Sequence, residues 1–429
     1  MATPMKPSEV IDRMIGYKVI ETGIEHGTVT VMLDNVPVEV TTYRIDTATD
    51  GRHAEVEYTD SLKLDLARRD FTINAMSWDG NCSYILYDPF GGQSDLENGI
   101  LRTVGDAKQR FDEDYLRPLR GLRFQSYLPL TLDTPTLNAI YASNMASKIN
   151  LGGECKVEKP VAVQRVMAEI KKVFERSDAD GCEGFLQHMY ILGVIDVLLP
   201  ELQMGPVPCH ELIHRHKYHP EGDVWTHIRI VTSLAKGWEG RMFGLLHDIS
   251  KPETAAWDPT GDEKQPDGWY TFHKHAKVGG ERIPKVAKRL KLDNKLRDKA
   301  ILVTQWHLYV YQVTPTVKTV RKVQVALGDD LPLLEALGKA DHMEGHKHGR
   351  PVEDHVKLYF LLPGEKGSLI EEDIPKDNIV TAKDLMEQEK DPWVPGPELG
   401  GALQAAEDAQ NLGETNKAVL MEIANGTRK

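Results

Sequence analysis

The chain has 429 residues, of which 41% are hydrophobic and 27% are charged, and its formal net charge is −13 at pH 7. The length allows roughly two to four modules, and the composition is that of an ordinary globular protein. The acidic balance argues mildly against nucleic acid as the main partner, although local basic patches decide such contacts. No apolar run approaches a bilayer span and no signal peptide is recognised, so we expect no membrane partner. The four cysteines show no paired spacing, which favours reduced thiols and a cytoplasmic location.

A β-hairpin is the first predicted element. Residues 29–33 are rich in β-branched side chains, Asp34-Asn35 marks a turn, and residues 36–43 alternate between apolar and polar positions. Because side chains alternate across a strand, Val40 would face one side of the sheet and Glu39 the other.

Helices are predicted for most of the remaining chain. Residues 65–76 have a helical pattern, and a turn at Asp79-Gly80 and a short strand at 84–87 follow. Further helices are predicted near 112–126, 160–177, 183–197, 224–235, 240–250, 275–290 and 295–310, and a last helix near 399–411 after an irregular stretch at 362–398. The fold class is therefore predicted as α+β, with a mixed head followed by a long helical body.

Arginines recur at three-residue steps in the segment Glu113-Asp-Tyr-Leu-Arg-Pro-Leu-Arg-Gly-Leu-Arg-Phe124. On a single helix, Asp114 and these arginines would spiral across part of the surface while the leucines face a core. Forked guanidinium groups suit phosphate oxygens or a base edge. A solvated, salt-bridged helix face is the alternative interpretation.

A second basic segment lies upstream, where Arg68, Arg69 and Asp70 precede an apolar stretch. Packed arginines can hold a triphosphate, and the adjacent carboxylate can accept a hydrogen bond from a ribose hydroxyl. Ordinary surface charges at a helix end would give the same pattern.

Four strings, in order, resemble class II tRNA nucleotidyltransferases, the CCA-adding enzymes that are grouped with bacterial poly(A) polymerases. They occupy residues 68–76, 88–92, 99–105 and 113–117. The resemblance implies a nucleotidyltransferase head of the DNA polymerase beta kind, followed by an all-helical neck, an HD body and a tail. It implies addition of C, C and A to the 3′ end of tRNA, with CTP and ATP as donors and Mg²⁺ as cofactor.

The resemblance also implies a nucleotide site. Its residues would be Arg69, Asp70, Asp114, Arg117, Arg120 and Arg123. Arg69 would contact phosphate or ribose, and Asp70 would lie at the sugar. Asp114 and Arg117 would hydrogen-bond to the Watson–Crick edge. A carboxylate accepts from an exocyclic amine and a guanidinium donates to a ring nitrogen and carbonyl, which favours C and A.

The sequence departs from the family pattern at two places. Pro118 lies inside the arginine segment, where a proline beyond the first helical turn would kink the helix. The family's Asp-x-Asp strand precedes an Ala-Thr pair, which stands here at positions 2 and 3. We therefore expect a partial head, with a late start site, a small separate chain or upstream segment, or a decayed transferase as explanations.

Glu39 is the remaining candidate for a catalytic carboxylate that holds magnesium. A solvated strand residue is the alternative. Since one carboxylate binds two magnesium ions poorly, we expect weak transfer activity from this chain alone.

Histidines form the second constellation. His227 is followed by His247-Asp248, and further histidines and an aspartate follow at 275, 307 and 341. Imidazoles and carboxylates that converge from separate helices suit a divalent transition metal such as Ni²⁺ or Mn²⁺. The series resembles the HD phosphohydrolase superfamily, which implies His227, His247, Asp248 and Asp341 around a first metal and His275 and His307 around a second. Water activated there would attack a 2′,3′-cyclic phosphate or a phosphomonoester.

Four domains are predicted: a head at 1–125, a neck at 126–205, an HD domain at 206–350 and a helical tail at 351–429. The basic stretch 274–299 either tracks a tRNA backbone or forms a polar helix face. Beside CCA addition, two alternatives stay open: an HD phosphohydrolase with a remnant head, and a non-catalytic tRNA-binding subunit.

Overall fold

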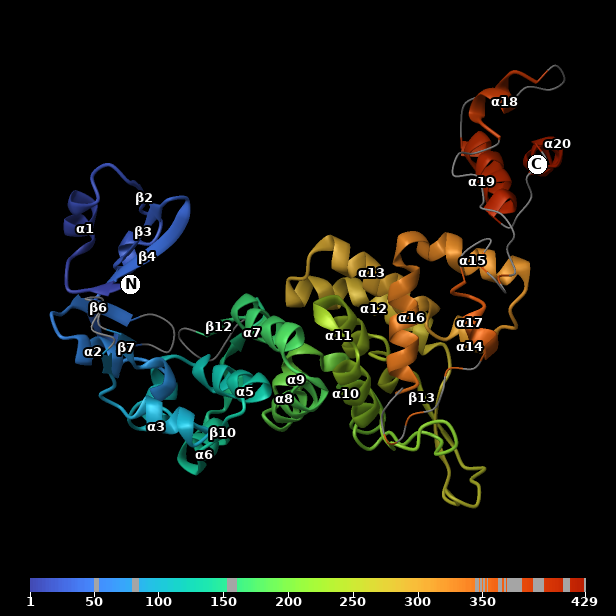
Figure 1. Ribbon diagram of the computed structural model, residues 1–429. Coiled ribbons are helices and arrows are strands. Elements are labelled where there is room, and N and C mark those ends of the chain that lie inside the picture. Colours follow the sequence, from blue (N-terminus) through green and yellow to red (C-terminus); the bar gives the residue numbers. More distant parts are fainter. Residues whose placement is uncertain are drawn as a thin grey trace. The chain divides into compact units, whose positions relative to one another are not determined.

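The computed structural model describes residues 1–49, 54–78, 85–152 and 160–343. Beyond these, it describes 347, 349, 352, 354–361, 365, 368, 380–388, 397–411 and 417–427. The chain divides into two compact units, which comprise residues 1–200 with 289–291 and residues 201–288 with 292–429 (Figure 1). The predicted domain boundaries, including the one at 205, stay predictions.

The first unit begins with a four-stranded sheet in the order β1-β4-β3-β2. Its elements are β1 (Ala2–Thr3), α1 (Pro7–Arg13), β2 (Lys18–Ile20), β3 (Thr28–Leu33) and β4 (Val36–Thr42). Strand β1 runs parallel to β4, and the other neighbours are antiparallel. Helix α1 packs on the sheet through a core that contains Val10, Val29, Val31 and Val40.

The predicted hairpin is confirmed as β3 and β4. Asp34 and Asn35 have φ angles of 48° and 64°, the left-handed pair that a two-residue hairpin turn requires. In this register Val29 pairs with Val40 and Thr30 pairs with Glu39. Val40 is buried and Glu39 is exposed, as the alternation predicts.

Short elements build the rest of the head. They are β5 (Arg44–Thr49), β6 (Ala54–Tyr58), α2 (Leu62–Ala67), β7 (Ser77–Trp78), β8 (Leu86–Tyr87), α3 (Gly92–Glu97), β9 (Ile100–Leu101), α4 (Ala107–Glu113), α5 (Arg117–Tyr127), β10 (Thr131–Leu132) and α6 (Thr134–Ala142). The predicted helix over 65–76 is wrong beyond residue 67, since Phe71 has extended angles and bridges Thr103. The turn predicted at Asp79-Gly80 lies outside the described residues.

The arginine segment is not one helix, which corrects the sequence interpretation. Helix α4 ends at Glu113, Asp114 is its extended C-cap, and α5 begins at Arg117. Pro118 therefore occupies the first turn of α5, where no intrahelical N–H bond is lost, and the predicted mid-helix kink is wrong. The break lets Asp114 point independently of the arginines on α5.

Helices complete the first unit. After β11 (Ile149–Asn150) and β12 (Val161–Ala162) come α7 (Val163–Arg176), α8 (Ala179–Ile191) and α9 (Val194–Leu198). The helix predicted over 183–197 is divided between α8 and α9 by Gly193, whose φ of 67° ends α8. Helix α5 packs against both α7 and α8. This packing anchors the helix that carries the arginines.

The second unit is largely helical, and β13 (Ala255–Asp258) and β14 (Trp269–Phe272) form an antiparallel pair in it. Its helices are α10 (Val224–Leu234), α11 (Gly237–Leu246), α12 (His275–Leu290), α13 (Asn294–Trp306), α14 (Tyr309–Gln312), α15 (Val317–Leu327), α16 (Leu331–Asp341), α17 (Asp354–Lys357), α18 (Ala382–Met386), α19 (Pro397–Asn411) and α20 (Lys417–Asn425). Helices α10 and α11 pack closely. A Cβ at Gly244 of α11 would lie 2.8 Å from the Cα of Thr232 on α10.

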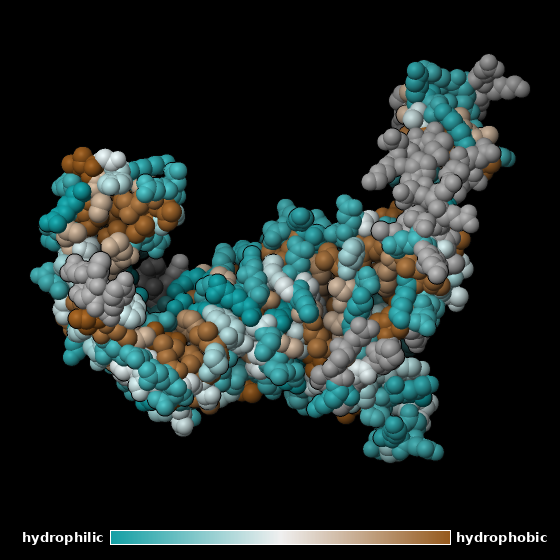
Figure 2. Space-filling model, viewed as in Figure 1, coloured by the Kyte–Doolittle hydropathy of each residue, from teal (hydrophilic) through white to brown (hydrophobic). Residues whose placement is uncertain are grey.

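The C-terminal helices have a small apolar core of their own. Leu385, Leu399, Ala402 and Leu420 contribute to it. No described helix is long and apolar enough to cross a bilayer. In Figure 2, hydrophilic side chains cover much of the visible helical surface, while a more apolar area is seen on the head.

Candidate functional sites

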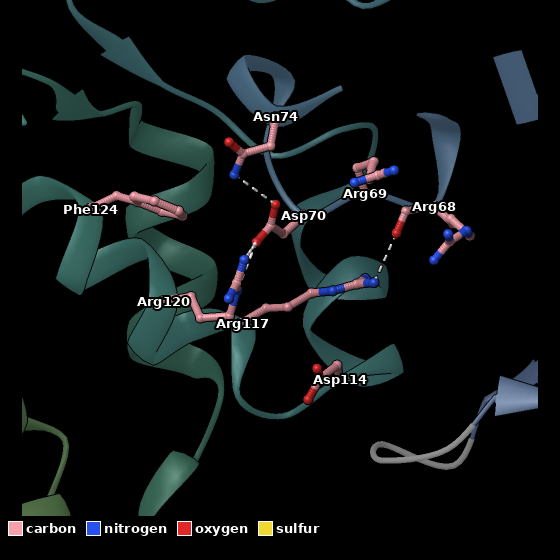
Figure 3. A pocket seen from close by; sticks show the side chains of 8 residues that line it. All are labelled: Arg68, Arg69, Asp70, Asn74, Asp114, Arg117, Arg120 and Phe124. Carbon is pink, nitrogen blue, oxygen red and sulfur yellow. Dashed lines mark hydrogen bonds and ion pairs between the residues drawn. The ribbon is translucent and has the colours of Figure 1, made fainter. Parts of the chain in front are cut away.

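A cavity of about 420 Å³ opens in the first unit, between the end of α2 and the start of α5. Its walls are polar and are made of Arg68, Arg69, Asp70, Asn74, Asp114, Arg117, Arg120 and Phe124 (Figure 3). The sequence motifs thus converge, because residues 68–74 and 114–124 are far apart in the chain and face one cavity.

Asp70 and Arg120 form the central ion pair of this cavity. The guanidinium donates to one carboxylate oxygen of Asp70 from Nε at 2.8 Å and from Nη2 at 2.6 Å. The other oxygen accepts from the amide of Asn74 at 3.1 Å and from the backbone N–H of Phe71 at 2.9 Å. Burial alone would raise the pKa of Asp70, but Arg120 and these hydrogen bonds outweigh it and lower the pKa.

Asp114 and Arg117 are also tied to protein groups. Asp114 accepts from the backbone N–H of Leu116 at 3.0 Å and from Arg165 of α7 at 3.0 Å. Arg117 donates to the Glu113 carboxylate at 2.7 Å and to the carbonyl of Arg68 at 2.8 Å. Each side chain keeps further acceptor or donor positions, since a carboxylate has about four lone-pair sites and a guanidinium five N–H donors.

Arg69 and Arg123 were both predicted to bind the nucleotide, but only Arg69 lines the cavity. Arg69 is 40% exposed at the cavity and 3.3 Å from Asp65. Arg123 is buried, pairs with Glu169 and lies over the ring of Phe124 at 3.9 Å, and it does not line the cavity. Its role in nucleotide binding stays a prediction.

Glu39 lies on β4 and is exposed. Among the described residues, the groups of three or more possible metal ligands all belong to the second unit. Glu39 belongs to none of these groups, and its role as a magnesium ligand stays a prediction.

Two cavity residues received no role from the sequence. Asn74 stands inside the motif at 68–76, and Phe124 ends the arginine segment. Only their position in these strings could have indicated a part in the site.

The metal-type residues of the second unit come mainly from helix ends. His227 lies within α10, His247 caps α11, His275 begins α12, His307 follows α13 and Asp341 ends α16. All except Asp341 are at most 6% exposed. The six predicted metal residues therefore meet in one buried centre.

Asp248 lies between two pairs of histidines. Its Oδ2 is 3.1 Å from Nε2 of His247 and 3.4 Å from Nε2 of His227. Its Oδ1 is 3.1 Å from Nε2 of His275 and 3.7 Å from Nε2 of His307. Asp341 Oδ1 completes the first group, 3.0 Å from Nε2 of His227.

The four histidines present the same nitrogen to this centre. Their Nδ1 atoms are hydrogen-bonded elsewhere, at 2.8 Å to Gly244 O for His247, 2.6 Å to Phe272 O for His275, 2.6 Å to Thr304 O for His307 and 2.7 Å to Glu221 Oε1 for His227. In a neutral imidazole, an oxygen that accepts from Nδ1 fixes the proton there, so Nε2 offers its lone pair to a metal. The Nε2 atoms lie 3.3 Å apart in the first pair and 3.4 Å in the second. Facing lone pairs at these distances fit a cation between them.

The protonation of the centre without metal follows from its charges. Burial and the Lys251 ammonium lower the pKa of His227, but hydrogen bonds to Asp341 and Glu221 outweigh them and raise it to about 9. Burial lowers the pKa of His307 to about 3. Without metal, a proton on His227 takes the place of a cation, so metal binding releases protons.

A cavity of about 1240 Å³ opens onto this centre. His214, Arg215 and Lys251 line it, together with the rings of Trp269 and Tyr311. Lys251 Nζ lies 2.6 Å from Asp248 Oδ2 and 3.0 Å from His214 Nε2. The sequence did not single out His214, which contacts Lys251 across 37 positions of the chain, and it assigned no role to Glu221.

The basic stretch 274–299 lies mostly on α12 and α13. Lys277, Lys285, Lys288 and Lys295 are exposed, whereas Arg282 pairs with Glu253. Only part of the stretch is therefore consumed by ion pairs.

Comparison with known proteins shows what the head is similar to. Residues 1–102 match the "Poly A polymerase head domain" family. The resemblance drawn from the motifs is confirmed. Over less than half of its length, the chain is similar to CCA-adding enzymes.

Both sequence and fold support this relationship. Over 190 residues the chain is 40% identical to the CCA-adding enzyme of Staphylococcus epidermidis. The aligned region covers 44% of this chain and 43% of that enzyme. Over 202 residues it is 41% identical to the mitochondrial CCA tRNA nucleotidyltransferase 1 of Mus musculus, covering 45% of this chain and 42% of the relative. The matched region thus spans less than half the length of these relatives.

The likeness in fold is more extensive. The crystal structure of the Bacillus stearothermophilus CCA-adding enzyme in complex with CTP covers 99% of this chain and 88% of that chain, with a TM-score of 0.60 and 23% identity. The predicted α+β head and helical body are confirmed by this similarity of fold.

Proposed function

We propose that this chain is a nucleotidyltransferase that adds C and A residues to the 3′ end of tRNA, with CTP and ATP as donors. The observation that carries the proposal is the cavity in which Asp70, Asp114, Arg117 and Arg120 meet. The relationship to the CCA-adding enzymes supports it, since one relative is described as a tRNA nucleotidyltransferase and another was crystallised with CTP.

The cavity supplies two kinds of group that a nucleotide requires. Arg69 and Arg120 provide positive charge for phosphate oxygens. Asp114 retains acceptor positions for an exocyclic amine, and Arg117 retains donors for a ring nitrogen and carbonyl. C and A present an exocyclic amine to such a carboxylate, whereas U does not. Glu39 stays our candidate for a magnesium ligand.

Incorporation of radiolabelled CTP and ATP into tRNA that lacks its terminal CCA tests this function. We expect weak labelling from CTP and ATP in the presence of Mg²⁺, less from GTP or UTP, and a loss of label for Asp114→Ala. Asp112→Ala is the matched control, because Asp112 contacts Lys108 and Lys148 and does not line the cavity. Absence of label at any protein concentration would overturn the proposal.

A second activity is favoured by the position of Asp248 between two histidine pairs. We propose that the second unit binds two divalent transition-metal ions, such as Ni²⁺ or Mn²⁺, and hydrolyses a phosphoester. Bound metal would supply Lewis-acid activation of water. His227, His247, Asp248 and Asp341 would hold the first ion, and Asp248, His275 and His307 the second.

Hydrolysis of 2′,3′-cyclic AMP and of a nucleoside monophosphate, measured with Mn²⁺ or Ni²⁺, tests the second activity. We expect release of product by the wild type and none by His247→Ala. Equal release by both would assign the activity to a contaminant or to another part of the chain.

A further inference from the structure

The carboxylate of Glu221 lies behind His227, on the side away from the centre. Its Oε1 accepts from Nδ1 of His227 at 2.7 Å and from Nδ1 of His219 at 2.9 Å. The side chain is 0% exposed, and Oε2 has no hydrogen-bond partner. A buried carboxylate is costly unless its partners compensate for the lost hydration, so its location has a structural reason.

The reason lies in where His227 sits on its helix. His247, His275 and His307 each donate Nδ1–H to the carbonyl three residues earlier. These residues lie at helix ends, where carbonyls are not all used by the helix. His227 lies inside α10, whose carbonyls are engaged in helical bonds, so an acceptor for its Nδ1–H must come from outside the helix.

We propose that Glu221 is a positioning residue of the metal centre. It holds the proton of His227 on Nδ1 and thereby aims the lone pair of Nε2 at the position between His247 and Asp248. This inference rests on the metal centre proposed above. His219 shares the same oxygen and stacks on His214 at 4.2 Å, which keeps the carboxylate in place.

Two substitutions of Glu221 separate the effect of its hydrogen-bond acceptor from the effect of its side-chain volume. Glu221→Leu fills the buried space but offers no acceptor, whereas Glu221→Gln keeps an acceptor at Oε1. Glu263→Ala is the control, because Glu263 is an exposed glutamate of the same unit that does not line the cavity. Each full-length protein is titrated with Co²⁺ by calorimetry, and the visible absorption of bound Co²⁺ reports the ligand geometry.

We expect Glu221→Leu to weaken Co²⁺ binding by about 10- to 100-fold and to alter the absorption spectrum. Glu221→Gln should recover most of the affinity, and Glu263→Ala should match the wild type. A folded Glu221→Leu protein with wild-type affinity and spectrum would overturn the inference. A wild type that binds no Co²⁺ would instead overturn the metal centre itself.

A measurement on the wild type keeps the test decisive if Glu221→Leu does not fold. In the Zn²⁺-loaded protein, ¹⁵N spectra of the histidines should show His227 protonated at Nδ1 and metal-bound at Nε2. Coordination through Nδ1 would contradict the positioning role of Glu221.

Discussion

Arg120 binds the carboxylate of Asp70 through two N–H groups, at 2.8 and 2.6 Å, and so joins α5 to the motif after α2. A lysine at this position would keep the charge but could not make the forked contact. We expect Arg120→Lys to weaken CTP binding about tenfold or more, because both Asp70 and a bound phosphate lose a fixed guanidinium.

Calorimetric titration with CTP measures this effect. Lys108→Arg is a control, since Lys108 is an exposed surface residue paired with Asp112. Unchanged CTP affinity in Arg120→Lys would remove Arg120 from the nucleotide site.

The same ion pair predicts a pH dependence of stability. Arg120 and Asn74 lower the pKa of Asp70 below its ordinary value of 3.8 despite its burial. A carboxyl whose pKa is lower in the folded state contributes stability that is present above its unfolded pKa and is lost as the pH falls through the folded pKa. We therefore expect Asp70→Asn to have a lower free energy of unfolding than the wild type at pH 7. This difference in free energy should become smaller below about pH 4.

Urea unfolding at a series of pH values from 7 to 2 measures the free energy of unfolding of the wild type and of Asp70→Asn. A gap that stays constant, or that widens on acidification, would contradict the lowered pKa of Asp70.

Arg123 and Glu169 are both almost fully buried and form an ion pair. Removal of one member of a buried pair leaves an uncompensated charge and costs about 3–5 kcal/mol. We expect Glu169→Gln and Arg123→Met each to lower the free energy of unfolding on this scale. In CTP titrations, Arg123→Met should lose little affinity at temperatures where it is folded. A selective loss of CTP affinity would instead place Arg123 in the nucleotide site.

The two carboxylate oxygens of Asp248 face different histidine pairs, which predicts two metal ions per chain. We expect about two equivalents of Mn²⁺ in the wild type, about one in His307→Ala and less than one in Asp248→Ala. Elemental analysis after gel filtration counts the bound metal. Chelation should lower the melting temperature of the wild type, since a ligand at 100 times its Kd stabilises the fold by about 2.7 kcal/mol. Equal metal content in Asp248→Ala and the wild type would be incompatible with a shared carboxylate.

Gly244 allows α11 to approach α10 closely, and these helices carry His247 and His227. An added Cβ would lie 2.8 Å from Thr232 Cα, so the helices would have to separate. We expect Gly244→Ala to weaken Co²⁺ binding and to destabilise the fold by about 1–3 kcal/mol.

Gly240 on the same helix is the matched control, because a Cβ there would meet only Ala235 Cβ at 3.9 Å. Gly240→Ala should stabilise the helix by up to about 1 kcal/mol and leave Co²⁺ affinity unchanged. The same result for both glycines would show that helix separation does not control the centre.

The sequence by itself determined the features that depend on local pattern. The β3–β4 hairpin followed from alternation and from Asp34-Asn35, and the family followed from four strings that include residues 68–76. The six candidate metal ligands were named from the sequence because histidines and aspartates are the side-chain types that bind transition metals, even though they are spread from residue 227 to residue 341. Helices whose apolar pattern continues over many residues, such as α7 and α12, were also predictable.

Tertiary structure alone decided how these residues face one another. The chain breaks between α4 and α5, which separates Asp114 from Arg117. Periodicity indicated one helix instead. The sequence could not exclude this, because a proline is compatible with a helix start as well as with a kink. Arg123 has the same spacing as Arg120, yet packing against Glu169 buries it. Glu221 acquires its role from a contact with His227 that no spacing rule specifies. Such contacts depend on how whole helices pack, and a linear pattern carries no information about that geometry.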